Sequence, residues 1–251
     1  MQERSGSVQR LASAVRVLLA TLSSYALGYP LTTLLIFSCI VADLVNARGY
    51  IRCCVAFWGR LVFWLVGRRI HVQGREHRVE GRAYLVLANH SSMYDIPALL
   101  AVVPDVALVG REKLTRIPVF RRLLEIIRYV PINTEEIRKA RGAIAEAVRR
   151  AEEGCSIGMY PEGTRTLDGR VQKLKRGFVY VLRESRLDVL PVTIRGTFAF
   201  KPKGRFTMDP RDRIEVTVHP PMESAGLVRL TDDEIMERVG AVLDGGVYGE
   251  Q

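Results

Sequence analysis

The sequence predicts an α/β protein: a mixed, largely parallel β-sheet flanked by helices and preceded by a helical segment that associates with a membrane. Three observations support this fold class. Residues 17–42 contain no charged side chain, apolar strand-like runs alternate with helix-like segments beyond residue 70, and polar loops follow the strand-like runs. We therefore divide the chain into N-terminal membrane-associated helices at 1–69 and a sheet-containing domain at 70–251.

The first predicted element is an apolar helix within residues 17–42. About 20 apolar residues are enough for a helix to cross the hydrocarbon core of a bilayer, so this run is long enough for one span. Gly28, Tyr29 and Pro30 interrupt it and leave two halves that are each too short to span. A kinked single span and a shallow hairpin within one leaflet both fit this pattern.

A second apolar segment, CCVAFWGRLVFWLVG at 53–67, is rich in aromatic residues. Arg60 lies in its middle and Arg68 and Arg69 follow it, a pattern typical of an interfacial helix whose arginines extend toward water. The alternative is a buried helix of the core.

The N-terminal run is too long for a cleaved signal peptide, and no small-residue cleavage site closes it before Asp43. The four cysteines have neither a metal-binding nor a disulfide-like spacing, which favours a reducing, cytoplasmic setting.

Beyond residue 70 the predicted elements alternate. Strands are predicted at 83–88, 106–109, 156–160, 189–194 and 214–219. Helices are predicted at 118–128, 135–153, 177–184 and 232–243. Sites in such folds gather where strands end and loops begin, so the loops after these strands are the candidate functional segments.

The loop NHSSMYD at 89–95 follows the first of these strands and holds one of the four histidines. His90 and Asp95 diverge if the stretch is all helix or all strand. They meet if His90 lies on a turn and Ser92 caps a new helix in which Asp95 is the third residue. Asp95 then orients the imidazole, whose other nitrogen is free to take a proton from a substrate. The alternative is that Asp95 only completes a capping box with Ser92.

Two further loops carry positive charge. GREKLTRIPVF at 110–120 places Lys113 and Arg116 before an amphipathic helix, which either contacts lipid or an acyl chain or packs on the core. MYPEGTRTLDG at 159–169 is a turn whose backbone N–H groups and Arg165 suit an anion. The alternative for the second loop is a surface ion pair between Glu162 and Arg165. A last segment, LPVTIRG at 190–196, carries Pro191 and is otherwise typical of a core strand.

The net charge also bears on partners. The 251 residues include 37 Lys and Arg against 27 Asp and Glu, a formal net charge of +10. This balance favours an anionic partner, either a membrane surface or nucleic acid. The charges are spread along the chain and no nucleic-acid-binding motif is present, so we expect membrane lipids and no nucleic acid.

The segments NHSSMYD, GREKLTRIPVF, YPEGTRT and LPVTIRG occur in this order over roughly residues 70–220. In them the sequence resembles the glycerophospholipid acyltransferase family, in particular the bacterial 1-acylglycerol-3-phosphate acyltransferases (PlsC-like). The first and third segments are the most diagnostic parts of the resemblance.

The resemblance implies a role for several residues and makes 70–251 an acyltransferase domain. His90 is the implied general base, Asp95 orients it, and Pro191 helps to shape the acyl pocket. The residues implied to bind the glycerol phosphate or to shape its pocket are Glu162, Gly163, Thr164 and Arg165, with Lys113 and Arg116 as further phosphate contacts. No metal or cofactor is implied, because an acyl thioester is already activated.

The sequence departs from the family pattern in two places. Asn133 and Thr134 stand where the family often has an Asp and an Arg, and Phe120 and Arg121 stand where a Gly often follows the Pro of the second segment. The first departure bears on the phosphate site and the choice of acceptor.

The implied reaction transfers a fatty acyl group from acyl-CoA or acyl carrier protein to the free hydroxyl of lysophosphatidic acid, at the cytoplasmic face of a bacterial inner membrane. Other acceptors are glycerol 3-phosphate, another lysophospholipid or a lyso-aminolipid. Two remote alternatives are a nonenzymatic binder of anionic lipid or nucleic acid, and a serine hydrolase using Ser156 in GCSIG at 154–158. The hydrolase needs a strand before the serine and a helix after it, and the predicted order is the reverse.

Overall fold

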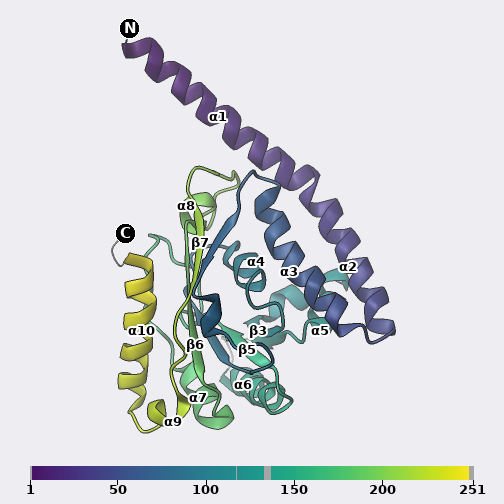
Figure 1. The fold of residues 1–251 in the computed structure, drawn as a ribbon, viewed down its shortest axis with the longest axis vertical. Helices are drawn as coiled ribbons and strands as arrows, with labels where there is room; N and C mark the ends of the chain where they lie inside the picture. Colours follow the sequence, from purple (N-terminus) through teal and green to yellow (C-terminus); the bar gives the residue numbers. More distant parts are fainter. Residues whose placement is uncertain (1, 117, 133–136, 249–251) are drawn as a thin grey trace.

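The computed structural model describes residues 2–116, 118–132 and 137–248, and a seven-stranded β-sheet lies at its centre (Figure 1). The strand order is β1-β7-β6-β2-β5-β3-β4. Neighbouring strands are parallel except β6 and β7, so the predicted mixed, largely parallel sheet is confirmed. The strands are β1 (Ile70–Gln73), β2 (Leu85–Ala88), β3 (Val106–Arg111), β4 (Val130–Ile132), β5 (Ser156–Met159), β6 (Val189–Arg195) and β7 (Ile214–Val218).

Helices cover both faces of the sheet. Helices α2, α3 and α4 share one buried hydrophobic cluster with one face, and α6, α7 and α10 share a second cluster with the other. The helices are α1 (Gln2–Ala26), α2 (Gly28–Leu44), α3 (Arg48–Trp64), α4 (Asp95–Leu100), α5 (Pro118–Ile126), α6 (Ile137–Glu152), α7 (Gly177–Ser185), α8 (Thr197–Phe200), α9 (Ser224–Leu227) and α10 (Asp232–Tyr248), with 3-10 turns η1 (Arg75–His77) and η2 (Glu112–Arg116).

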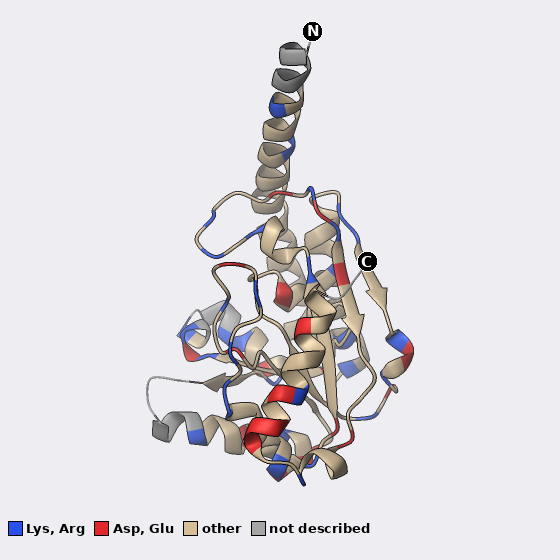
Figure 2. Ribbon diagram, turned by 90° about the vertical axis from the view of Figure 1, so that its left-hand side faces the viewer, with Lys and Arg blue, Asp and Glu red and all other residues tan. Residues whose placement is uncertain are grey.

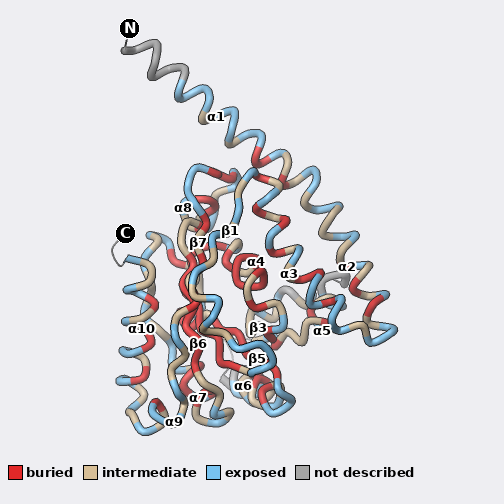
Figure 3. The backbone as a smooth tube through the Cα atoms, viewed as in Figure 1, coloured by how far each residue is buried: buried red, intermediate tan, exposed pale blue. Residues whose placement is uncertain are grey.

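The central strands are buried along their length, as Figure 3 shows. Strands buried on both faces consist of continuous apolar residues, and this is why β2, β5 and β6 are predictable from the sequence. The sequence did not predict β1 or β4. The first alternates between half-buried and exposed residues and the second has only three residues, so neither forms a clear apolar run.

The apolar N-terminal run forms two successive helices. Only Leu27 separates α1 from α2, and backbone hydrogen bonds from Leu27 to Ser23 and from Leu31 to Leu27 continue across the junction. The chain therefore does not reverse at 28–30, as a hairpin centred there would require; it reverses later, between α2 and α3, and the kinked span stays a prediction. The helical stretch Gln9–Leu44 is long and apolar enough to cross a membrane, and much of α1 is exposed (Figure 3).

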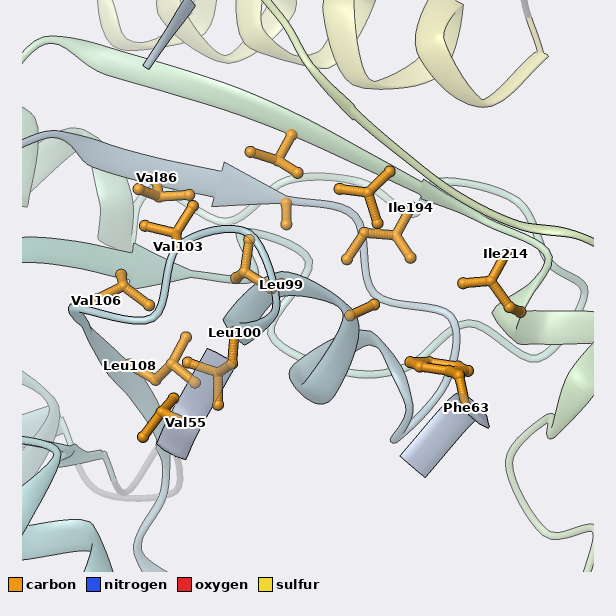
Figure 4. Close-up of a cluster of buried hydrophobic side chains, with 14 of the residues drawn as sticks. Val55, Phe63, Val86, Leu99, Leu100, Val103, Val106, Leu108, Ile194 and Ile214 are labelled. Carbon is orange, nitrogen blue, oxygen red and sulfur yellow. The ribbon is translucent and has the colours of Figure 1, made fainter. Parts of the chain in front are cut away.

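Helix α3 combines features of both alternatives for its segment. One face is buried against α4, where a Cβ atom added to Gly59 would lie 2.4 Å from the carbonyl oxygen of Pro97. Figure 4 shows Val55 and Phe63 of this face in the same apolar cluster as Leu99 of α4. The opposite face exposes aromatic side chains, Tyr50, Phe57 and Trp64. The interfacial role of α3 and the domain boundary at residue 69 stay predictions, although α3 clearly packs on the sheet-containing part.

Candidate active site

The candidate site lies where three adjacent parallel strands end. His90 follows β2, Glu162 follows β5, and Thr197 follows β6. The carboxyl ends of parallel strands meet at one edge of the sheet, so these distant parts of the sequence converge. Asn89 joins two of them: its side-chain oxygen accepts the Ile194 N–H (2.7 Å), and its amide donates to the Ile194 carbonyl (2.9 Å). The amide of Asn89 thus continues the pairing of β2 with β6 after β2 has ended.

His90 and Asp95 are in contact, as the sequence predicts. Nδ1 of His90 lies 3.0 Å from Oδ2 of Asp95, and because a carboxylate accepts, Nδ1 is the donor. Among the described residues, Nε2 of the same ring has no hydrogen-bond partner. The His90 side chain is 16% exposed, so this ring reaches solvent, whereas Asp95 is fully buried.

The predicted start of the following helix is wrong. Helix α4 begins at Asp95 itself, with Tyr94 before it, and no side chain of a described residue caps the helix. The Ser92 hydroxyl instead donates to the Lys201 carbonyl (2.7 Å) and accepts the Tyr94 N–H (3.2 Å). Asp95 therefore reaches His90 from the first helical position, because residues 90–92 curl around its carboxylate.

The Asp95 carboxylate accepts hydrogen bonds from several sides. Oδ2 receives the N–H groups of Ser91 (2.6 Å) and Ser92 (2.7 Å) in addition to the imidazole. Oδ1 receives the hydroxyl of Thr197 (2.5 Å), and the Ser91 hydroxyl lies at 3.4 Å. The bond to Ser92 N–H is the one that the capping-box alternative requires, so Asp95 organises the loop and orients His90 at once.

The loop after β5 holds the backbone of His90 on both sides. Oε1 of Glu162 accepts the His90 N–H (2.5 Å), and the Thr166 N–H donates to the His90 carbonyl (3.0 Å). Oε2 of Glu162 accepts the Gln172 N–H (2.8 Å). Glu162 is 2% exposed, and burial raises its pKa to about 7 despite these two hydrogen bonds. Its contacts make Glu162 a brace for His90 within this loop.

Tyr160 packs directly on the imidazole. The two rings stack with centroids 4.1 Å apart and planes 21° apart. The Tyr160 hydroxyl is buried and has no hydrogen-bond partner among the described residues, and burial, followed by the charge of Asp95, raises the Tyr160 pKa well above its usual range. The Tyr160 ring thus limits the tilt of the His90 ring. The Tyr160 hydroxyl group gains no hydrogen bond from the described residues to offset its burial.

The remaining residues of the third segment lie on the same turn. Gly163 has φ +68, a conformation that favours glycine, and a Cβ atom there would lie 3.0 Å from the Lys175 side chain. Thr164 and Arg165 are half-buried. Lys113 and Arg116 are exposed on η2, beyond β3, and no contact joins them to His90 in the described part of the chain. Their roles toward a phosphate stay predictions.

Pro191 lies inside β6, opposite Leu87 of β2, and is buried. Leu190 and Val192 belong to the cluster beneath α3 and α4, so alternation directs Pro191 toward the other face of the sheet. Its role in an acyl pocket stays a prediction. The departure at Asn133 and Thr134 lies outside the described residues.

The structure contradicts the serine-hydrolase alternative. Ser156 is the first residue of β5, so a strand follows it instead of preceding it, and its buried hydroxyl accepts the Tyr84 N–H (3.2 Å). His219, the downstream histidine, pairs with the Thr193 hydroxyl (3.0 Å). Within the described ranges, no group of three or more His, Cys, Asp or Glu side chains is placed to hold a metal ion.

Sequence reasoning did not single out Thr197, Asn89, Tyr160 or Thr166 as residues of the site. Thr197 lies 102 residues after Asp95, and nothing in its local pattern indicates the contact. Asn89 is adjacent to His90 in the first segment, and its buried position after a strand was a usable signal for a structural amide.

Comparison with known proteins identifies the family of this chain. A protein-family model described as Acyltransferase matches residues 69–195, about half of the chain. The chain belongs to the Acyltransferase family. The resemblance inferred from the four segments is therefore confirmed.

Two curated members of the family and one solved structure are similar to this chain. A 1-acyl-sn-glycerol-3-phosphate acyltransferase of Limnanthes alba is 31% identical over 185 residues, 72% of this chain and 62% of that protein. One of Borreliella burgdorferi is 28% identical over 150 residues, 59% of this chain and 58% of that protein. The chain thus spans less than two thirds of the length of these relatives.

The crystal structure of the 1-acyl-sn-glycerophosphate (LPA) acyltransferase PlsC from Thermotoga maritima matches with a TM-score of 0.81 and 28% identity. The match covers 93% of this chain and 95% of that one. This acyltransferase fold is the one that the sequence predicts.

Proposed function

We propose that this chain transfers a fatty acyl group from an acyl thioester to the free hydroxyl of lysophosphatidate and so makes phosphatidate. The observation that carries the proposal is the His90 and Asp95 pair, with Nδ1 bound to a buried carboxylate and Nε2 without a protein partner among the described residues. Lysophosphatidate is chosen as the acceptor because the similar proteins are named 1-acyl-sn-glycerol-3-phosphate acyltransferases.

The reaction follows from this pair. Nε2 of His90 takes the proton of the acceptor hydroxyl as the oxygen attacks the thioester carbonyl, and Asp95 stabilises the imidazolium that forms. The tetrahedral intermediate collapses, the carbon–sulfur bond breaks, and His90 returns the proton to the leaving thiolate. The products are an ester and a free thiol, so all atoms of the two substrates are accounted for and the reaction needs no cofactor.

The rigid surroundings of His90 support this mechanism. Its backbone is held by Glu162 and Thr166, its ring is stacked on Tyr160, and its Nδ1 is fixed by Asp95. A general base whose position is fixed before the substrate arrives loses little entropy in the reaction.

We further propose that Arg165 binds the phosphate of the acceptor. It is half-buried and directly precedes Thr166, whose N–H donates to the His90 carbonyl, so its backbone lies close to that of the base. A guanidinium group binds phosphate through two parallel hydrogen bonds. We propose Lys113 and Arg116 as further phosphate contacts, from the turn η2 that follows β3.

The apolar helical stretch Gln9–Leu44 supports a location at a membrane, where the lysophosphatidate acceptor and the phosphatidate product reside. The net positive charge supports docking on an anionic lipid surface. In a bacterium the acyl donors are cytoplasmic, so we propose the cytoplasmic face of the inner membrane.

An acceptor panel tests the proposed function. The detergent-solubilised protein is incubated with lysophosphatidate, glycerol 3-phosphate, lysophosphatidylcholine and a lyso-aminolipid, each with acyl-CoA and with acyl carrier protein as donor. Mass spectrometry should find phosphatidate as the dominant product. A dominant product from another acceptor would overturn the choice of lysophosphatidate, and no product from any pair would overturn the activity.

A further inference from the structure

Lys201 is the one Lys or Arg that is buried in the part of the chain that the structure describes, and it lies beside the loop at 89–95 that carries His90, here called the catalytic loop. The residue as a whole is only 9% exposed. Buried lysines are normally paired with a carboxylate, because an isolated ammonium group is costly to remove from water. Among the described residues, Lys201 has no carboxylate partner; its Nζ donates to the Arg205 carbonyl (2.6 Å) and has capacity for two more hydrogen bonds.

Neighbouring positive charges further disfavour the charged form of the Lys201 side chain. Burial, and then the positive charges of Arg165 and Arg205, lower the Lys201 pKa. The guanidinium group of Arg205 is occupied by backbone carbonyls, including those of Phe200 (2.5 Å) and Thr207 (3.1 Å). Lys201 and Arg165 therefore form a pair of cations whose charge no described acidic side chain offsets.

This pair is anchored to the catalytic loop from both sides. The Lys201 carbonyl accepts the Ser92 hydroxyl (2.7 Å), and its N–H donates to the carbonyl of Thr197, whose own hydroxyl binds Asp95. Arg165 adjoins Thr166, which holds the His90 carbonyl. Figure 2 shows the loop after α8, with its Lys and Arg residues, next to the base of α1.

The phosphate of the acceptor carries the negative charge that Lys201 and Arg165 do not receive from any described acidic side chain. In lysophosphatidate the free hydroxyl and the phosphate are on adjacent carbons of glycerol, so an acceptor whose hydroxyl lies at His90 must place its phosphate close by. We infer that Lys201 is a second cationic ligand of the acceptor phosphate, acting with Arg165, and that it selects phosphate-bearing acceptors. This inference rests on the proposed function for the identity of the acceptor.

The test compares Lys201→Met, which keeps the aliphatic stem, with Lys203→Gln, an exposed lysine two residues further along the same loop. The readouts are kcat and KM for lysophosphatidate, and the shift in thermal unfolding midpoint caused by lysophosphatidate or by 1-monoacylglycerol of the same chain length. Lys201→Met should raise the KM for lysophosphatidate about 10- to 100-fold, the usual effect of losing a charge-assisted contact, and change kcat little.

The thermal shift by lysophosphatidate should shrink in Lys201→Met, that by 1-monoacylglycerol should not, and Lys203→Gln should match the wild type in every readout. Lys201→Arg, which keeps the charge, should keep the KM within about threefold of the wild type. Equal losses for both ligands, or no loss for either, would overturn the inference. If Lys201→Met does not fold, Lys201→Gln takes its place with the same expectations.

The thermal shift requires no turnover, so it separates this inference from the proposed function. Binding of lysophosphatidate that depends on Lys201, in a wild-type protein that makes no phosphatidate, would contradict the proposed function and support the inference. Phosphatidate synthesis whose rate and KM do not change in Lys201→Met would support the proposed function and contradict the inference.

Discussion

The substitution Asp95→Asn tests how the buried carboxylate serves the candidate base. Asparagine has the shape of aspartate and retains one oxygen for the N–H groups of Ser91 and Ser92. Its amide can face the hydroxyl of Thr197, which can rotate to accept. The variant therefore keeps the loop but loses the negative charge beside His90.

The size of the effect follows from the contact distance. Nδ1 and Oδ2 are 3.0 Å apart, which places the two charge centres about 4 Å apart when the ring is protonated. Such a pair is worth roughly 4 kcal/mol at an effective dielectric constant of about 20, and the amide dipole recovers part of it. A net loss of about 3 kcal/mol corresponds to a fall in kcat of about 100-fold.

The assay is phosphatidate formation at saturating donor and acceptor, with unfolding in urea measured in parallel. The free energy of unfolding should fall by about 1–3 kcal/mol, because charge-assisted hydrogen bonds become neutral ones. Asp105→Asn is the matched control, since Asp105 is a partly exposed partner of Arg78 at 2.6 Å and is expected to keep its activity. A folded Asp95→Asn variant with kcat within threefold of the wild type would refute the reasoning.

Three further predictions concern the supports of the site. Because burial raises the Glu162 pKa to about 7 from 4.5, the folded protein holds a proton that the unfolded chain has released between these pH values; this contribution to stability is complete below about pH 4.5 and lost by about pH 7. Urea unfolding should show stability falling by about 3 kcal/mol between pH 4.5 and 8 relative to Glu162→Gln, and parallel profiles would contradict this. Tyr160→Phe removes a buried hydroxyl without a described partner, so it should keep activity and raise the free energy of unfolding by about 1 kcal/mol; a tenfold loss of turnover would instead assign the hydroxyl to the substrate. Gly59→Ala would place a Cβ atom 2.4 Å from the Pro97 carbonyl and push α4 away, costing about 1–3 kcal/mol and lowering turnover, whereas Gly49→Ala meets nothing within 4 Å and should do neither. Equal melting temperatures for the two glycine variants would exclude this close packing.

The parts of the fold that the sequence predicts are those with a local cause. Strands β2, β5 and β6 are continuous apolar runs because both faces of each are covered, and the meeting of His90 with Asp95 follows from the change of structure between them. The exact start of α4 was not predictable in this way. The start of α4 depends on the backbone N–H groups of Ser91 and Ser92, which turn toward the Asp95 carboxylate. The capping pattern in the sequence instead predicted a helix that begins after Ser92.

The supports that were missed depend on contacts between distant parts of the chain. Thr197 binds Asp95 across 102 residues, and Lys201 is bound to Ser92 across 109, so no local pattern contains them. Glu162 was found by its segment, but its contact partner was not: the sequence suggested an anion site, whereas the carboxylate accepts the His90 and Gln172 N–H groups.

The most direct measurement is the initial rate of phosphatidate synthesis by His90→Ala and by the wild type at equal concentrations of folded protein. With the imidazole as the base, the variant should be slower by at least about 100-fold, while its thermal unfolding midpoint stays close to that of the wild type. An unchanged rate in the purified variant would show that another group accepts the proton, and the role proposed for His90 would be wrong.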